Sequence, residues 1–156
     1  MTVRIVEVGP DDPRLPPLIG ELRAELDARY PEEIDLDHPV VKREAHFLLA
    51  IRSGVPVACC AVQPLDGDEC ELKRMYVVPD VRGQGIAGRL MTRVEELAAR
   101  LGAVRVKLET GQRQPEAIKV YERAGYAQIP NYPPYDGWDL SVCYAKALVP
   151  SVPSTP

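Results

Sequence analysis

The sequence predicts a single α/β (α+β) domain with a mixed, mostly antiparallel central sheet of about six or seven strands, flanked by about four helices. Short apolar runs bounded by turn residues alternate with longer segments whose apolar residues recur every three or four positions. The 156 residues are 46% hydrophobic and 27% charged, which is ordinary for a globular domain with a real core. We assign residues 1–149 to this domain and expect a disordered tail over residues 150–156.

The first half of the chain predicts one strand, one helix and a meander of three strands. Residues 3–8 alternate apolar and charged side chains, and residues 15–30 have a helical spacing that ends at Tyr30-Pro31. Residues 31–39 are acidic and irregular, with one turn of helix at most. They form either a solvated loop or a lid that attracts a cationic substrate. The meander is predicted at residues 45–51, 55–62 and 69–78.

The second half predicts two more helices and three more strands. A glycine-rich loop opens a helix that runs from Gly85 to Gly102, where glycine supplies the stop. The strand at 104–108 follows this helical crossover, so it is expected to lie parallel to the strand before it. Pro115, at the favoured first position, opens a helix that runs over 116–124, and strands at 126–129 and 141–147 complete the chain.

The loop that follows Pro79 is the most informative stretch. Proline ends the preceding strand because it cannot donate to a ladder, and a helix begins directly after three glycines. The first N–H groups of a helix and its positive dipole end point at one place, which suits a phosphate. Gly83, Gly85 and Gly88 let an anion approach the main chain. Nearby arginines can pair with phosphate oxygens.

This glycine pattern leaves more than one nucleotide-binding class open. The lysine and hydroxyl that close a nucleoside-triphosphate loop are missing. Residues 83–88 do fit the letters G-x-G-x-x-G of a dinucleotide domain, and the next strand ends in Glu109. That domain places its loop after the first strand of alternating units, whereas this loop follows about four strands. The order of elements therefore weakens the dinucleotide interpretation.

Composition argues against several other classes. The net charge of −4 gives no nucleic-acid-binding surface, and no apolar run approaches the roughly 18 residues of a membrane helix. The N-terminal residues lack a signal-peptide core. Four cysteines without metal or redox spacing and two isolated histidines give no reason to expect a metal. We expect a cytoplasmic protein without nucleic-acid or membrane partners.

Two motifs resemble the GNAT superfamily of acetyl-CoA-dependent N-acetyltransferases. Residues 82–87 match the family's pyrophosphate motif, [Q/R]-x-x-G-x-[G/A], and residues 75–79 resemble the strand that leads into it. Residues 115–126 resemble its second motif, a short helix that ends in YE-x-x-GY/F. The resemblance covers roughly residues 69–128 and implies a GNAT-like fold whose strands splay at the cofactor site.

The resemblance implies acetyl-CoA (coenzyme A) as the cofactor. Backbone groups of Val77 and Val78 would bond the pantetheine arm, and Tyr121 would protonate the departing CoA thiolate. Many members carry an asparagine before the second helix, where this chain has Gln112 and Gln114. The expected cofactor-binding residues are Met75, Tyr76, Val77, Val78, Arg82, Gly83, Gln84, Gly85, Ile86, Ala87, Gly88, Arg89, Gln114, Ala117 and Tyr121.

Acetylation of an amine also needs a base, because neutralising a lysine-like amine at pH 7 costs about 4.6 kcal/mol. Glu71 is the first candidate, since the family's strand glutamate base lies six residues before the position of Val77. Without a bulge, Glu71 and Lys73 share a strand face with Val77. The alternative is a solvent-facing or Lys73-paired carboxylate. Glu109 is the reserve candidate.

The expected catalytic residues are thus Glu71 and Tyr121. Proton transfer from a tyrosine to a thiolate is uphill by roughly 2 kcal/mol for ordinary pKa values, which a transient step tolerates. The alternative for Tyr121 is a tyrosine that merely packs in its helix.

The sequence leaves the substrate open. Aromatic residues at 30, 132, 135 and 138 either wall a pocket or pack. If Lys73 holds a carboxylate, the substrate resembles an amino acid, whereas a dominant acidic segment at 31–39 favours a polyamine or aminoglycoside. The expected substrate-binding residues are Tyr30, Lys73, Glu109, Tyr132 and Tyr135.

We predict an N-acetyltransferase that moves an acetyl group from acetyl-CoA to a primary amine of a small molecule, with general base and acid assistance. One alternative is a protein or peptide N-acetyltransferase, which an open groove would favour. Another is a non-catalytic acyl-CoA-binding sensor, against which Tyr121 and Glu71 argue. The resemblance also allows a homodimer, because late strands often mediate dimers in this family.

Overall fold

The computed structural model describes residues 2–148. Its centre is one seven-stranded sheet in the order β1-β2-β3-β4-β5-β7-β6. Among the neighbouring strands of this sheet, β4 and β5 pair in parallel and the other five pairs are antiparallel. The mixed sheet and the parallel crossover are therefore confirmed. The strands are β1 (Val3–Val8), β2 (His46–Arg52), β3 (Val55–Pro64), β4 (Glu69–Val77), β5 (Arg105–Gly111), β6 (Ala127–Ile129) and β7 (Ser141–Ala147).

Three α-helices accompany the sheet within residues 2–148: α1 (Leu15–Arg29), α2 (Ile86–Arg100) and α3 (Pro115–Arg123). The expected fourth helix is a 3₁₀ turn, η1 (Pro31–Glu33), because the chain after Tyr30 is too acidic and irregular to extend it. Two further 3₁₀ turns are η2 (Pro79–Val81) and η3 (Tyr135–Gly137). The tail predicted for residues 150–156 lies outside the described residues.

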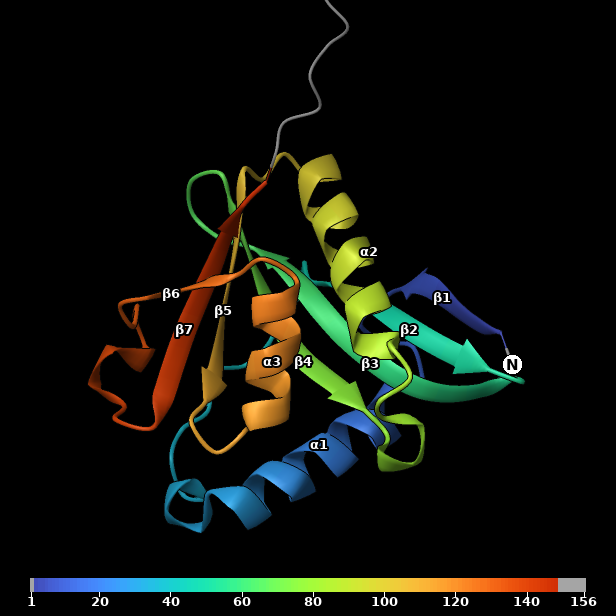
Figure 1. Cartoon of the computed structure of the whole chain (residues 1–156), viewed down its shortest axis with the longest axis horizontal. Coiled ribbons are helices and arrows are strands. Elements are labelled where there is room, and N and C mark those ends of the chain that lie inside the picture. The colour runs from blue at the N-terminus through green and yellow to red at the C-terminus, as the bar shows by residue number, and fades with distance from the viewer. Residues whose placement is uncertain (1, 149–156) are drawn as a thin grey trace, which may run out of the picture.

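The molecule has three layers, with α1 on one face of the sheet and α2 and α3 on the other (Figure 1). Side chains of β2 alternate between the two cores: Leu48 packs with α2, and Leu49 packs with α1. Within residues 2–148, none of the helices has the length and apolarity that crossing a membrane requires. The cytoplasmic location stays a prediction.

The strands β4 and β5 separate partway along their length. They pair over only four residues, from Glu69 opposite Arg105 to Leu72 opposite Leu108. Beyond that point β5 continues to pair with β7 as far as Gly111, so β4 is the strand that leaves its neighbour. The splay expected from the family resemblance is confirmed. It opens the middle of the sheet beside the first turns of α2 and α3 (Figure 1).

A β-bulge interrupts β4 just where the strands separate. Cys59 of β3 lies opposite Tyr76 and Ala61 lies opposite Lys73, so two residues of β4 stand against one of β3. One of them, Arg74, has a φ of 57°. After the bulge the alternation reverses, so that Leu72 and Val77 both pack against the core that contains α2. The condition for a shared face, the absence of a bulge, is therefore not met, and Glu71 and Lys73 do not share a face with Val77.

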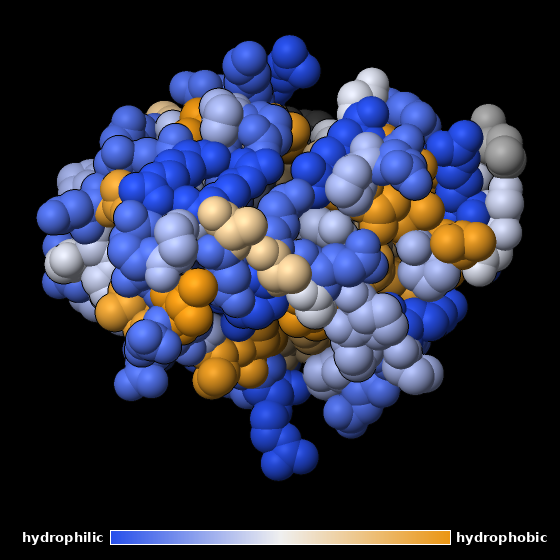
Figure 2. Space-filling view, turned by 90° about the horizontal axis from the view of Figure 1, so that it is seen from below, coloured by the Kyte–Doolittle hydropathy of each residue, from blue (hydrophilic) through white to orange (hydrophobic). Residues whose placement is uncertain are grey.

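The end of the molecule that carries α1 is mainly hydrophilic, with apolar side chains in separate patches (Figure 2). Three of the large apolar side chains that are exposed belong to the chain between η1 and β2: Ile34, Leu36 and Val40. Scattered apolar exposure of this kind is ordinary for a protein surface.

Candidate active site

The splayed strands open onto a cavity of about 620 Å³, which we call the long cavity. It runs from the glycine-rich loop and the start of α2, past the end of β4, to α3. Val78, Gln84 and Arg89 do not line it, although they were expected to bind the cofactor. The expected residues that do line it are Met75, Tyr76, Val77, Arg82, Gly83, Gly85, Ile86, Ala87, Gly88, Gln114, Ala117 and Tyr121.

The first turn of α2 supplies an anion site at one end of the long cavity. Gly85 is the N-cap and has a φ of 81°, which glycine adopts without steric cost. The first intrahelical bond runs from the Arg89 N–H to the Gly85 carbonyl at 3.1 Å. The N–H groups of Ile86, Ala87 and Gly88 precede it and have no intrahelical partner. Free amides at a positive helix end fit a diphosphate.

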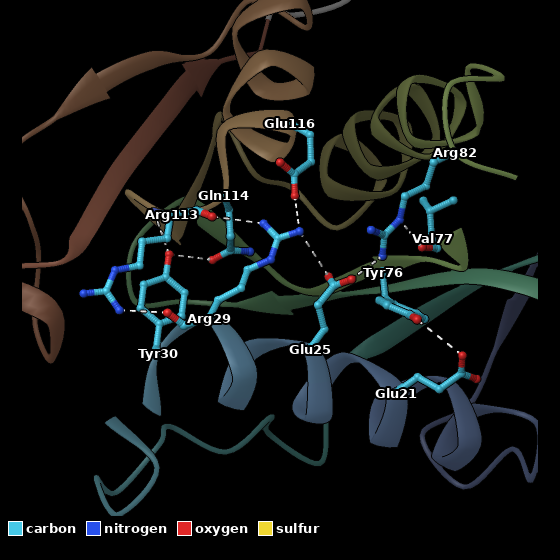
Figure 3. Close-up of polar contacts among 10 residues, drawn as sticks. All are labelled: Glu21, Glu25, Arg29, Tyr30, Tyr76, Val77, Arg82, Arg113, Gln114 and Glu116. Carbon is cyan, nitrogen blue, oxygen red and sulfur yellow. Dashed lines mark hydrogen bonds and ion pairs between the residues drawn. The ribbon is translucent and has the colours of Figure 1, made fainter. Parts of the chain in front are cut away.

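Several groups expected to bind the cofactor are already bonded within the protein. Arg82 donates from Nε to the Val77 carbonyl and from Nη2 to Glu25, both at 2.8 Å (Figure 3). The Val78 N–H donates to the Val57 carbonyl at 2.9 Å. The side chain of Arg82 therefore fixes the loop onto α1 and β4 instead of standing free for a phosphate.

An ion-pair chain joins α1 to both walls of the long cavity (Figure 3). Arg29 contacts Glu116 at the start of α3, and its Nη2 lies 3.9 Å from Glu25. Glu25 in turn binds Arg82. All three contacts are partly exposed, so each contributes little alone, but together they hold α1 across the gap between the splayed strands.

Tyr121 projects from α3 into the long cavity and is only 5% exposed. Its ring packs against Tyr126, and no described residue forms a hydrogen bond with its hydroxyl. Burial is the main reason that the pKa of Tyr121 is raised well above that of a free tyrosine. The hydroxyl therefore keeps its proton at neutral pH. It is also a weaker acid than the side chain of a free tyrosine.

A second, smaller cavity of about 100 Å³ lies on the other side of Gln114, which lines both cavities. We call it the acceptor pocket. Four expected substrate-binding residues line it: Tyr30, Lys73, Glu109 and Tyr135. Tyr132 does not, because its hydroxyl donates to Glu71 at 2.7 Å and its ring packs edge-on against Tyr135.

Glu109 is the carboxylate of the acceptor pocket whose pKa suits a base. Burial raises its pKa to about 7, while the hydrogen bond from Ser141 Oγ, at 2.7 Å, and the charge of Lys73 act in the opposite direction. The carboxylates of Glu33 and Glu71 contribute a further rise. A pKa near the working pH is the value that general base catalysis needs.

Glu71 lines neither cavity and is fully engaged in a buried network. Its Oε1 accepts a bond from Gln63 at 2.8 Å, and its Oε2 accepts the bond from Tyr132. Lys73 Nζ lies 3.7 Å from Glu71 and donates to the Tyr135 hydroxyl at 2.6 Å. The bulge explains this placement, since it separates the face of Glu71 from that of Val77.

Sequence reasoning missed several residues of the acceptor pocket, among them Arg74, Gly111 and Ser141. Arg74 reaches the pocket only because of the bulge, which no single-strand pattern reveals. Ser141 was merely the first residue of a predicted strand. Gly111 follows the strand that was expected to end at Leu108, and only the longer β5 brings it to the pocket.

We expect Gly111→Ala to displace Tyr30 and raise the KM for the amine, because a Cβ on Gly111 would overlap the Tyr30 hydroxyl. That hydroxyl also accepts the Arg113 N–H at 2.9 Å, so the fold is expected to lose about 1–3 kcal/mol. Amine titrations and urea unfolding measure the two effects. Gly20→Ala, in α1 with open space around it, is the matched control. An unchanged KM for Gly111→Ala would contradict this role of Tyr30.

The free N–H groups at the start of α2, the splayed strands and a pocket with a carboxylate of raised pKa are together typical of an acyltransferase. Residues 14–126 match the model of the acetyltransferase (GNAT) family, and the chain belongs to that family. The predicted family and the N-acetyltransferase class are thereby confirmed.

Particular relatives agree with this assignment. The chain is 38% identical over 136 residues to an IAA acetyltransferase from Azospirillum brasilense, covering 84% of this chain and 88% of that protein. A structure described as an acyl-CoA N-acyltransferase from Klebsiella pneumoniae has 31% identity and a TM-score of 0.79, covering 95% and 99%. A GNAT acetyltransferase from Elizabethkingia anophelis with acetyl-CoA bound shares the fold, with 19% identity, a TM-score of 0.67, and coverage of 94% and 98%.

Proposed function

We propose that this protein transfers an acetyl group from acetyl-CoA to the primary amine of a small molecule. The observation that carries the proposal is that Gln114 lines both a long cavity with free helix amides and a small pocket with a carboxylate of raised pKa. The first cavity, of about 620 Å³, combines this volume with an anion site suited to a nucleotide thioester. The second has room only for a small group, which favours a small molecule over a protein side chain on a broad surface.

The residues present fit acetyl-CoA. The amides of Ile86, Ala87 and Gly88 would hold its diphosphate, and the apolar lining at Met75 and Ala117 would contact its arm. When bound, acetyl-CoA supplies a thioester whose carbonyl carbon an amine nitrogen attacks, the C–N bond forming as the C–S bond breaks. The binding roles of Gln84, Val78 and Arg89 are not included in this proposal, because their side chains lie outside the cavity.

We assign the base role to Glu109 rather than Glu71. Glu109 lines the acceptor pocket and, with a pKa of about 7, is half ionised at neutral pH, so it can accept a proton from an ammonium group. The hydroxyl of Ser141 holds one carboxylate oxygen in place. Glu71 does not line the pocket but contacts Lys73, which does, and accepts a hydrogen bond from Tyr132.

Tyr121 is the proton donor of the long cavity. Its hydroxyl keeps its proton at neutral pH and has no partner among residues 2–148 that would hold it elsewhere. The same burial that weakens it as an acid also disfavours a thiolate in the same place, since both anions lose solvation there. The difference in pKa between the Tyr121 hydroxyl and the CoA thiol is therefore smaller than the burial of Tyr121 alone suggests.

Purified protein with acetyl-CoA and a panel of primary amines tests the proposal. We expect free thiol to appear with at least one amine, together with a product heavier by one acetyl group in the mass spectrum. Thermal unfolding with and without acetyl-CoA separates binding from turnover. A raised Tm without thiol release would favour an acyl-CoA sensor, and no change in Tm would overturn the cofactor assignment.

A further inference from the structure

The acceptor pocket contains an arginine that has no ion-pair partner among the described residues. Arg23, Lys73 and Arg74 line the pocket. Arg23 is paired with Asp27 at 2.9 Å, and Lys73 is bonded to Tyr135 and lies near Glu71. The half-buried Arg74 donates to the Pro39 carbonyl at 2.9 Å and forms no ion pair with any residue from 2 to 148. A partly desolvated guanidinium without a carboxylate is costly unless a ligand supplies one.

The backbone is distorted at the residue that delivers this charge. Arg74 adopts a left-handed conformation, with a φ of 57°, that is sterically unfavourable for a residue with a Cβ. Because of the bulge, Lys73 and Arg74 line the same pocket although they are consecutive in a strand. Glycine or asparagine would occupy this position at lower cost. The residue at this distorted position is nevertheless an arginine that lines the acceptor pocket.

The acidic segment before β2 does not make the pocket a polycation site. Only Glu33 of its four acidic residues lines the pocket. Glu32 is turned to Arg113, with an Oε1–Nη1 distance of 2.6 Å, and Asp35 and Asp37 are exposed. Apart from His38, the charged side chains of the lining are therefore three cationic ones and two carboxylates, Glu33 and Glu109. This balance suits a ligand with charges of both signs.

We propose that the substrate is a small zwitterion, an α-amino acid or a close relative, whose carboxylate binds Arg74 while its amino group faces Glu109. The volume of about 100 Å³ corresponds to roughly three water molecules at ~30 Å³ each, which is enough for such a head group. The planar fork of arginine matches a carboxylate with two parallel hydrogen bonds. This inference rests on the proposed acetyl transfer to an amine and adds the class of that amine.

Matched ligands test the proposal directly. Wild type is assayed for thiol release with each of the twenty amino acids, with the corresponding amino-acid amides, and with the amines that lack the carboxyl group. We expect at least one amino acid to exceed its amide and its amine about tenfold or more in kcat/KM. Arg74→Asn keeps the left-handed backbone and removes the guanidinium. We expect it to lower kcat/KM for that amino acid about 10- to 100-fold, mainly through KM, and to change the amide less than threefold.

Two further variants separate the effect of the guanidinium's shape from that of its charge. Arg74→Lys keeps the charge without the fork, so it is expected to retain part of the preference. Arg43→Gln removes one exposed positive charge outside both cavities and is the control for net charge. Acetyl-CoA must raise the Tm of Arg74→Asn as much as that of wild type, which shows that the fold and the long cavity are intact.

The outcomes separate this inference from the proposed function. Turnover of amides or amines at least as fast as amino acids, or an equal loss for both ligand types in Arg74→Asn, overturns the zwitterion assignment and leaves acetyl transfer standing. Failure of every amine to release thiol overturns the proposed function. In that case the Tm rise with each amino acid, in wild type against Arg74→Asn, still decides whether Arg74 binds a carboxylate.

Discussion

Glu109→Gln is expected to lower kcat/KM by roughly 10²–10⁴-fold, the range that loss of a general base produces. The shape of the amide is close to that of the carboxylate, so Ser141 keeps a partner and the pocket keeps its volume. Activity of the wild type is expected to rise with pH through about 7, because Glu109 accepts a proton only when ionised. The variant loses that rise. Initial rates between pH 5.5 and 9 measure both effects.

The same substitution is expected to stabilise the fold above pH 7. The pKa of Glu109 is about 7 in the folded state and near 4.5 when unfolded, so the folded state binds more protons between these values. Its contribution to stability therefore falls as the pH rises from about 4.5 to about 7. Removing the charge is expected to recover about 1–3 kcal/mol at pH 8, measured by urea unfolding.

Glu71→Gln is the matched control for this result. It places an amide among Gln63, Lys73 and Tyr132, which already use the carboxylate, so it is expected to destabilise the fold. Because the Glu71 carboxylate makes only a small contribution to the raised pKa of Glu109, the substitution is expected to lower the midpoint of the pH profile slightly and to keep the rise itself. If Glu71→Gln abolished the rise near pH 7 and Glu109→Gln left it intact, the base would be Glu71 and our assignment would be wrong.

Tyr121→Phe is expected to lower kcat by about 10²-fold while the Kd for acetyl-CoA stays within about threefold. The hydroxyl makes no hydrogen bond with a described residue, so its removal breaks no contact of the fold, and the ring still fills its place beside Tyr126. Steady-state rates and calorimetric titration with acetyl-CoA measure the two quantities separately.

Tyr126→Phe provides the comparison for Tyr121→Phe. Tyr126 is also a buried tyrosine, but it does not line the long cavity, and its hydroxyl donates to Glu95 at 3.3 Å. Its loss is expected to reduce stability slightly and to leave kcat unchanged. Equal rates for Tyr121→Phe and wild type would remove Tyr121 from the mechanism.

Local patterns predicted the fold well because each element has its own signal. Pro115 is the first residue of α3, β7 has the predicted bounds 141–147, and the glycine loop opens α2 one residue after Gly85. The loop and the second motif also indicated the family. These features depend on residues that are neighbours in the chain, so they can be predicted from the sequence alone.

The choice between Glu71 and Glu109 could not be made in the same way. It depends on where β4 changes its alternation, and that is set by the pairing of Cys59 with Tyr76 and of Ala61 with Lys73, which are 17 and 12 positions apart in the chain. It depends also on β5, which extends three residues beyond Leu108 and so brings Gly111 beside Tyr30. Pairing between strands, rather than any local preference, decides both features.

The extra residue in β4 has an evolutionary consequence. Losing the codon of Arg74 would leave Lys73 opposite Ala61 and Tyr76 opposite Cys59, with one residue of each strand between these pairs. The side chains from Met75 to Val77 would keep their faces, because the pairing with β3 already sets them. A one-codon deletion therefore removes the guanidinium from the acceptor pocket while the wall of the long cavity stays in place.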